Sequence, residues 1–452
     1  MIYTEVKCKV VTPIISRKDP QTGEFDLTGQ SIKGVLHFWF RAVAPRVIDI
    51  YRLNEDNKPK SPKGNKELYE LYKTYEKEKY AGLKLLENEI FGSQKKKAPF
   101  GVWVEYSKQD LRTYSSQDER KNNGSIKRKN NGSIKSNGAF KYALYGIKEA
   151  KYLDVDSLFT LHFTFENRNI QNVISSLLKL TSLVGGIGAK TTKGFGRFEI
   201  IQNEEEKSNK SVDKRIENVL NEAELSIKEF IESKEILNTQ KKLKDVLIYT
   251  TQTKLLDFPN LCAGSYILKD TKIKAADLSS VISEIYEMSR GWYRQLKYVI
   301  RHNGELNKSK DSLIKLAEVL KARSKEPVEI PVAFLGLPLH YFFRKDDKIL
   351  RIFNEYDVEI KKKDKVITRK PSCLRILLFR DSDGKYFVNA LLLKSHISKI
   401  TENRYKLRIL SSDATKLKKE NNKTELENKK AYKAYLSADW EKLSGFIIKF
   451  EK

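Results

Sequence analysis

The stretch GGIGAKTTKGFGR, residues 185–197, decides how the rest of the chain is interpreted. It contains five glycines, two lysines and one arginine. Glycine adopts positive φ readily and lets the backbone approach a ligand closely, and successive exposed N–H groups form a concavity that suits anions. We therefore expect a phosphate-contacting loop rather than a turn whose lysines are merely solvated. The residues expected to make these contacts are Gly185, Gly186, Gly188, Lys190, Lys193, Gly194 and Arg197.

Two common phosphate-binding motifs do not fit this stretch. A P-loop requires a glycine directly before its Lys-Thr pair and another five residues earlier, but Ala189 and Val184 occupy those places. A dinucleotide-binding fingerprint follows a strand and opens a helix, whereas this stretch follows a predicted helix and precedes a predicted strand. Nucleotide hydrolysis and NAD binding are therefore disfavoured, and no cofactor is expected.

The flanking residues predict a strand and a helix before the glycine-rich loop and a strand after it. In residues 158–166 apolar side chains alternate with polar ones, which is typical of a strand with one buried face. Residues 169–184 place apolar side chains at helical spacing, and residues 197–201 predict a short strand. Together these segments form the second half of a β-α-β-β-α-β unit.

The first half of that unit lies nearer the N-terminus. Residues 1–14 and 100–106 predict strands, and residues 32–43 predict a helix capped by Ser31 and ended by Pro45. The order strand, helix, strand, strand, helix, strand predicts a ferredoxin-like domain. We place it at residues 1–205, with insertions at about 54–98 and 107–141. The second insertion contains the octapeptide RKNNGSIK twice in tandem, at 120–127 and 128–135.

The remaining chain predicts a linker and a second α+β domain. Residues 206–244 are densely charged and predict a linker with an amphipathic helix. Residues 245–452 predict the second domain, whose strand order is not readable from the sequence. It should start with a strand at 246–250, contain a hairpin at 374–379 and 386–393, and end in a basic helical tail at about 424–449.

The composition points to a polyanionic partner. Lys and Arg number 86 against 59 Asp and Glu, which gives a net charge of +27. Such a balance favours nucleic acid ahead of a membrane surface. No apolar run approaches the length of a membrane span, so we expect a cytoplasmic protein without membrane contact. The three cysteines are far apart and predict neither a disulfide framework nor a metal site.

Basic residues on the helix at 32–43 form a second candidate contact. Lys33, His37 and Arg41 are spaced i, i+4, i+8 and therefore share one helical face. This stripe suits a phosphate backbone, and it suits a merely solvated surface equally well. Trp39 and Phe38 could stack on bases, but their core spacing favours burial. Arg369 and Lys370, with Arg375, form a weaker candidate at the entrance of the predicted hairpin.

Several islands of sequence resemble a known family. They are VTP at 11–13, SIKGVLHFWFRA at 31–42, the glycine-rich loop, LGLP at 335–338 and RKPS at 369–372. Together they resemble the RAMP superfamily of CRISPR systems. The helix is most similar to that of the first subunit of the type III-B Cmr effectors. His37 stands where that pattern has arginine, and Phe40 where it has a second tryptophan.

The resemblance implies a fold and a function. The fold would be α+β, with tandem ferredoxin-like (RRM-related) domains, basic insertions and a glycine-rich loop after the second helix. The function would be that of a non-catalytic subunit that holds CRISPR guide RNA and helps capture target RNA. Its partners would be these RNAs and other Cmr or RAMP subunits. Target cleavage in such complexes belongs to another RAMP subunit.

Two other functions remain open at this point. Some RAMP relatives cleave RNA without a metal, and that chemistry requires a general acid and a general base, often histidine. Of the five histidines, His37 and His162 are the one plausible pair for an endoribonuclease acting on CRISPR repeat RNA. Sequence-specific DNA binding ranks last, because the chain shows no zinc-finger spacing and no evident helix-turn-helix.

Overall fold

The computed structural model describes most of the chain up to residue 301 and separate pieces after it. The described residues are 1–18, 24–63, 65–115, 138–147, 149–201, 211–236, 239–250, 255–287, 290–301, 328–329, 334–335, 339–343, 348–354, 372–396, 400–401, 404–413, 431–437 and 439–448. The duplicated octapeptide and the segment at 369–371 lie outside them.

A four-stranded antiparallel sheet organises the N-terminal part, with strand order β3-β6-β1-β7. Its strands are β1 (Ile2–Val10), β3 (Phe100–Tyr106), β6 (Leu158–Phe165) and β7 (Phe198–Ile200). Helix α1 (Gly29–Val43) connects toward β3, and helix α5 (Arg168–Val184) connects β6 to β7. These six elements occur in the β-α-β-β-α-β order predicted from sequence, because each carries a strong local apolar period.

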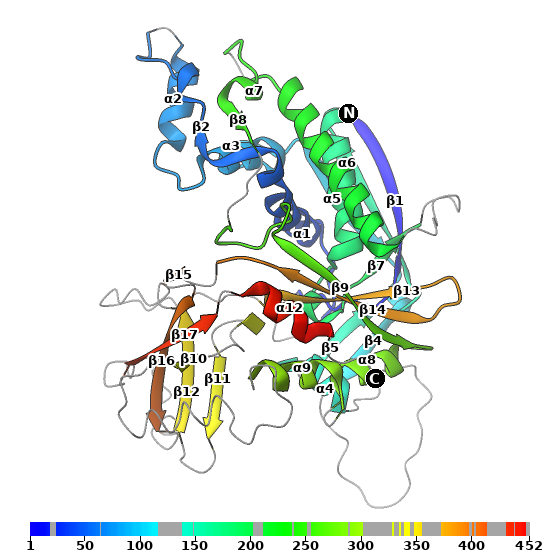
Figure 1. The fold of residues 1–452 in the computed structure, drawn as a ribbon. Helices are drawn as coiled ribbons and strands as arrows, with labels where there is room; N and C mark the ends of the chain where they lie inside the picture. The colour runs from blue at the N-terminus through cyan, green and yellow to red at the C-terminus, as the bar shows by residue number, and fades with distance from the viewer. Residues whose placement is uncertain are drawn as a thin grey trace, which may run out of the picture.

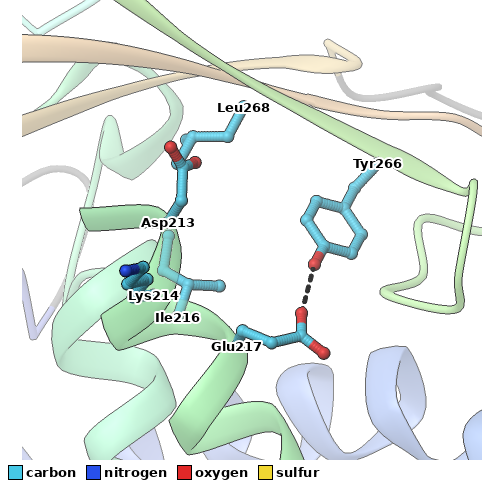
Figure 2. Close-up of a pocket in the computed structure, with 6 residues that line it drawn as sticks. All are labelled: Asp213, Lys214, Ile216, Glu217, Tyr266 and Leu268. Atoms are coloured by element: carbon cyan, nitrogen blue, oxygen red, sulfur yellow. Dashed lines mark hydrogen bonds between the residues drawn. The ribbon is translucent and has the colours of Figure 1, made fainter. Parts of the chain in front are cut away.

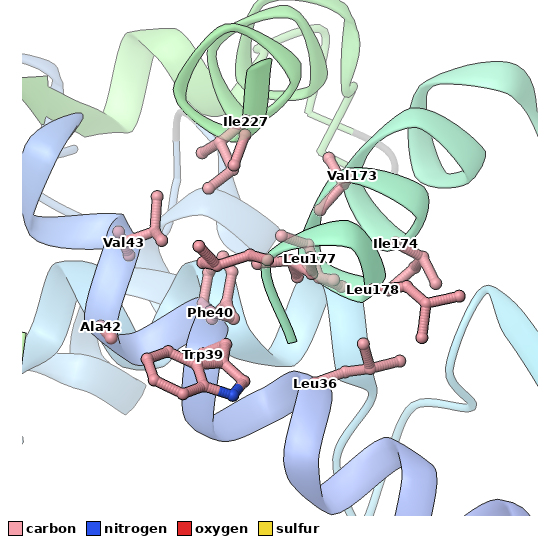
Figure 3. Packing of buried hydrophobic residues seen from close by; sticks show 14 of the residues in the cluster. Leu36, Trp39, Phe40, Ala42, Val43, Val173, Ile174, Leu177, Leu178 and Ile227 are labelled. Atoms are coloured by element: carbon pink, nitrogen blue, oxygen red, sulfur yellow. The ribbon is translucent and has the colours of Figure 1, made fainter. Parts of the chain in front are cut away.

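The helices bury one face of this sheet. Figure 3 shows Trp39 and Phe40 of α1 packed near Leu177 of α5, with Ile227 of α6 (Val212–Ser233) closing the cluster. The amphipathic helix predicted in the linker is therefore α6, and it packs along α5 rather than standing in solvent (Figure 1). Membrane-spanning length and apolarity are found in none of the helices that the structure describes.

The ends of α1 differ in part from the prediction. The side chain of Thr28, not Ser31, caps the helix, and its oxygen accepts a hydrogen bond from the Ser31 N–H at 3.1 Å. The helix ends at Val43 and continues as a short 3₁₀ turn that contains Pro45, as predicted. The cap was misplaced because threonine and serine serve this role almost equally well.

Several elements in and beside the two insertions were not predicted from the sequence. Residues after Pro45 form β2 (Ile48–Leu53), which pairs with β8 (Leu247–Tyr249). The predicted opening strand of the second domain is therefore confirmed as β8, but it pairs with a strand that precedes the first insertion. The first insertion contains two helices, and β4 in the second insertion pairs with β5 beyond its end. These elements are α2 (Lys66–Tyr75), α3 (Ala81–Phe91), β4 (Leu111–Ser115), α4 (Gly138–Ala143) and β5 (Glu149–Leu153).

A three-stranded sheet, in the order β13-β14-β9, joins the two halves of the molecule. The predicted hairpin is confirmed as β13 (Leu374–Arg380) and β14 (Tyr386–Leu393), and β14 also pairs with β9 (Tyr266–Ala275). Nearly every residue of the hairpin is buried, so both of its faces are covered.

Two separate hydrophobic cores meet across this hairpin. Leu377 and Phe379 belong to the core of the N-terminal sheet, while Ile376 and Leu378 belong to a second core. Alternation along one strand therefore divides its side chains between the two cores. The helices of the second core are α4, α8 (Leu278–Tyr286), α9 (Trp292–Arg301) and α12 (Trp440–Ile448).

A further sheet lies at one side of the molecule, away from β1 in Figure 1. Its order is β10-β17-β16-β12-β11, with β15 paired to β16. The strands are β10 (Val328–Glu329), β11 (Leu339–Phe343), β12 (Lys348–Asn354), β15 (Ile400–Thr401), β16 (Arg404–Asp413) and β17 (Ala431–Ser437). The predicted helical tail was therefore wrong over β17, where AYKAYLS alternates with a period of two.

Candidate nucleic-acid interface

The glycine-rich loop is held by its own chain over most of its length. The N–H of Ile187 donates to the Gly196 carbonyl at 2.8 Å, and the N–H of Ala189 donates to the Ile15 carbonyl at 2.7 Å. Most other N–H groups of residues 185–197 are likewise used. Only the middle of the loop, residues 188–193, reaches the surface. The expected open row of N–H groups is therefore much shorter than the sequence suggested.

Buried glycines in the loop permit close packing. A Cβ on Gly185 would lie 2.4 Å from Nε1 of Trp39, and one on Gly194 would lie 2.4 Å from Cδ1 of Leu378. Gly186 is also buried, against the carbonyls of Phe195 and Gly196. The expectation that these three glycines contact phosphate is therefore wrong: no ligand can reach them. Trp39 is fully buried, as its spacing predicted.

Arg197 does not add charge to a phosphate site, contrary to our prediction. Its side chain is 2% exposed. The guanidinium donates to the carbonyls of Leu183, Gly185 and Leu378 at 2.9, 2.8 and 3.2 Å. It also lies 4.8 Å from the ring centroid of Phe379. Burial lowers the pKa of Arg197 to about 9, so it stays charged at neutral pH and binds the loop to β13.

Lys190 and Lys193 lie on the accessible part of the loop. Their Nζ atoms donate to the carbonyls of Tyr145 and Tyr142 at 2.6 and 3.3 Å. Burial, with the neighbouring charges of Lys190 and Lys297, lowers the pKa of Lys193 to about 8. Burial and then Arg17 lower the pKa of Lys190. The contributions of Arg17 and Lys297 to these shifts indicate that several cations lie close together beside the loop.

The tertiary structure adds residues to this site that the sequence reasoning missed. Arg294 lies 4.4 Å from the ring centroid of Tyr142, which is also 5.2 Å from Nζ of Lys193. Figure 1 shows α4, α8 and α9 lying together. The charge of Lys297 on α9 contributes to the lowered pKa of Lys193, so this side chain belongs to the same group. We call this group the loop cluster. It consists of Arg17, Tyr142, Lys190, Lys193, Arg294 and Lys297.

One signal in the sequence could have identified the α9 contribution. Arg294 and Lys297 are spaced i, i+3, which places two basic side chains on one helical face. Aromatic rings from α4, α8 and α9 lie between these cations, with the centroids of Tyr142, Tyr286 and Tyr293 between 5.6 and 6.3 Å apart.

The basic stripe on α1 faces α3. His37 Nε2 lies 3.2 Å from Glu87 Oε1, and Arg41 forms a two-pronged contact with the same carboxylate. Burial raises the pKa of Glu87, but His37 and Arg41 outweigh it and hold the pKa below its usual value. Lys33 lies over the ring of Phe100 at 4.9 Å. The predicted shared face is confirmed, yet two of its three residues already have a protein anion.

The structure describes only one of the three basic residues expected to contact RNA at the entrance of the hairpin. Arg369 and Lys370 lie outside the described residues. Arg375 is buried, with its guanidinium 4.8 and 5.0 Å from the rings of Phe38 and Trp39. Arg375 therefore connects β13 to α1 and does not face a ligand, which corrects our grouping of it with the RNA contacts.

The part of the chain that contains α1 and the glycine-rich loop matches a known family model. The model of the RAMP superfamily matches residues 7–199. This part of the chain therefore resembles the RAMP superfamily. The match contains most of the four-stranded sheet, both of its helices and the whole glycine-rich loop. No curated protein sequence gives a significant match.

Several solved structures are distantly similar to the chain. Cmr1 from Pyrococcus furiosus is 12% identical, with a TM-score of 0.45, over 89% of this chain and 91% of that one. A chain of the type III-B Cmr-beta complex bound to cognate target RNA is 16% identical, with a TM-score of 0.40, over 86% and 94%. Cmr6 from Pyrococcus furiosus is 16% identical, with a TM-score of 0.24, over 44% and 98%.

The two histidines considered for catalysis lie on opposite faces of the N-terminal sheet. His37 lies on α1, which covers one face of the sheet, whereas His162 projects from β6 on the opposite face. His162 lies 2.7 Å from the Tyr3 hydroxyl and 3.1 Å from Glu105. The two imidazoles therefore cannot act on one phosphate as acid and base. Among the described residues there is also no group of side chains suited to a metal ion.

A shallow pocket lies apart from the loop cluster, between α6 and β9 (Figure 2). The Tyr266 hydroxyl donates to Glu217 across it at 3.1 Å. The lining side chains are Asp213, Lys214, Ile216, Glu217, Tyr266 and Leu268. Two carboxylates beside a single lysine disfavour a phosphate ligand, so this pocket is not part of the candidate interface.

Proposed function

We propose that the chain is a cytoplasmic, non-catalytic RNA-binding subunit of a type III-B CRISPR ribonucleoprotein, which holds guide RNA and helps capture target RNA. The RAMP match over residues 7–199 and the SIKGVLHFWFRA helix support the class of assembly. The observation that carries RNA binding is the loop cluster. It gathers cations from residue 17, from the glycine-rich loop and from α9 beside a group of tyrosine rings.

The charges of the loop cluster favour a polyanion over an isolated ion. Burial and then the charges of Lys190 and Lys297 lower the pKa of Lys193, so these three cations repel one another. A phosphate backbone would relieve this repulsion at several points at once and release condensed counterions. Tyr142 and the exposed Tyr145 could stack on bases, which is how single-stranded RNA is commonly held. Neither contact requires a catalytic group.

The tandem ferredoxin-like fold belongs to the same proposal. In the first half the order β1-α1-β3-β6 gives the sheet order β3-β6-β1, and in the second half β9-α8-β13-β14 gives β13-β14-β9. All these neighbouring strands are antiparallel. We infer two related domains at residues 1–205 and 245–452, joined by 206–244.

A salt-dependent RNA titration tests the proposal. Labelled single-stranded RNA is titrated with wild type and with the double variant Lys190→Ala, Lys193→Ala, and binding is followed by anisotropy. Removing two phosphate contacts should weaken binding at every RNA sequence and reduce the slope of log K against log salt by about 1–2. The matched control is Lys66→Ala with Lys73→Ala, which removes two exposed lysines from α2.

Two results would oppose the proposal. Equal affinity and equal salt slope for wild type and the loop double variant would remove the loop cluster from the RNA path. Site-specific cleavage of repeat RNA by pure protein without metal would contradict the non-catalytic role. Loss of such cleavage in His37→Ala would favour the endoribonuclease instead.

A further inference from the structure

The outer face of the N-terminal sheet carries a group of side chains that the proposed RNA site does not use. Alternate residues of β1, β3 and β6 point away from α1 and α5. Strand register places Trp103 opposite His162, and His162 opposite Glu5. Tyr3 lies one row along β1 from Glu5. The three strands thus bring aromatic and acidic side chains to one place.

Aromatic and aliphatic side chains are unusually exposed there. Trp103 is 47% exposed and Tyr3 53%, while the other three tryptophans of the chain are at most 8% exposed. The ring of Trp103 stacks on His162 with centroids 5.0 Å apart, and that of Tyr3 lies 5.9 Å from Trp103. Leu158 and Ile201 are also largely exposed on or beside this face. Exposed tryptophan and tyrosine are typical of protein–protein contact sites.

Two carboxylates flank the rings. The Tyr3 hydroxyl donates to Glu5 at 2.7 Å, and His162 Nε2 lies 3.1 Å from Glu105. The Glu5 and Glu105 side chains are nevertheless 49% and 77% exposed. On a chain with a net charge of +27, carboxylates beside exposed rings make this face locally unfavourable for a phosphate backbone. The nearest lysine pair along β1 is partly neutralised, because Lys9 contacts Asp156 at 2.8 Å.

We propose that this face docks a protein partner that presents an arginine side chain to Trp103, Glu5 and Glu105. A guanidinium can stack on an aromatic ring while its N–H groups reach a carboxylate, and no other side chain matches both features as well. Leu158 and Ile201, which lie beside Lys9 and Lys7 of β1, would contact apolar residues on one side of that arginine. The site is distinct from the loop cluster, because it offers the carboxylates of Glu5 and Glu105, whereas the charged members of the loop cluster are all cations.

The exposed tryptophan provides a direct assay in the full-length protein. A capped peptide with one arginine between two leucines is titrated while tryptophan emission is recorded. The same peptide is tested with citrulline or glutamate in place of arginine, and a single-stranded RNA oligomer is tested separately. The variants are Glu5→Gln with Glu105→Gln, Trp103→Phe as the signal control, and Glu67→Gln with Glu70→Gln on α2 as the matched charge control.

The arginine peptide should produce a saturable emission change that Trp103→Phe abolishes. Citrulline should weaken binding about fivefold and the Glu5, Glu105 variant about tenfold, because exposed cation–π and ion-pair contacts have this size. The α2 control should bind like wild type. The proposal is overturned by the absence of a saturable change, or by equal binding of the arginine and citrulline peptides. It is also overturned if RNA alone perturbs Trp103, because RNA would then occupy this face. None of these outcomes depends on whether the loop cluster binds RNA.

Discussion

Replacing Arg197 by methionine tests whether this guanidinium supports the fold or contacts RNA. Methionine keeps much of the apolar stem but removes the donors to three buried carbonyls, those of Leu183, Gly185 and Leu378. A buried carbonyl left without a donor costs about 1–3 kcal/mol. Part of this loss is offset because a buried charge no longer has to be desolvated. We expect a net destabilisation of about 3 kcal/mol.

Thermal unfolding measures this effect. For a unit of about 200 residues, 3 kcal/mol corresponds to a fall in Tm of about 6–12 °C. The matched control is Lys190→Met, which removes a half-buried cation from the same loop together with one hydrogen bond, to the Tyr145 carbonyl. It should change stability by about 1 kcal/mol or less. An unchanged Tm for Arg197→Met, together with RNA affinity as weak as in the loop double variant, would refute the structural role of Arg197.

Three further predictions concern the same region. Gly188→Val should destabilise the protein by about 2–3 kcal/mol, because φ is +89° and a Cβ would lie 2.4 Å from the Ile15 carbonyl oxygen. The control is Gly34→Ala on α1, where a Cβ meets nothing within 4 Å. It should be neutral or stabilising in the same thermal melts. RNA affinity should fall between pH 7 and pH 9 in wild type but not in Lys193→Arg, because Lys193, with a pKa of about 8, loses its charge in this range. The free energy of unfolding should rise over the same range, since the lysine of the unfolded chain stays charged. Glu87→Gln should lower the free energy of unfolding by about 1–2 kcal/mol at pH 7 and by little near pH 3. A carboxyl whose pKa is lowered in the folded state stabilises the fold above its unfolded pKa, and this stabilisation is lost as pH falls. Equal losses at both pH values would exclude the ion-pair explanation.

Local periodicity made several elements readable. The alternation in β6 and the 3.6-residue spacing in α5 predicted both elements within one or two residues. The β13–β14 hairpin was equally clear, because its turn sequence DSDG separates two apolar runs. These signals reside in short windows of sequence, and tertiary contacts reinforce them here rather than oppose them.

Pairing between distant segments was not readable. Strand β2 pairs with β8 across almost 200 residues. The sequence predicted β8 as a strand but not its partner β2, whose alternation is too weak to indicate a strand by itself. The predicted helical tail also failed at β17, although that segment alternates with a period of two, and pairing with β16 holds it extended. Short segments adopt the conformation that their partners impose, so propensity alone misassigns them.

The sequence by itself determined the glycine-rich loop, its two accessible lysines and the strand and helix that flank it, because these depend on residue type and spacing. Only the tertiary structure decided which basic residues remain available to a ligand. Arg197 carries the same positive charge in the loop as Lys190 and Lys193, yet β13 packs over it and buries it. Arg375 of β13 is likewise buried, against the aromatic rings of α1. Arg294 and Lys297 join the loop because α9 packs beside α8. Burial is a property of the elements that surround a side chain, and those elements come from parts of the chain more than a hundred residues away.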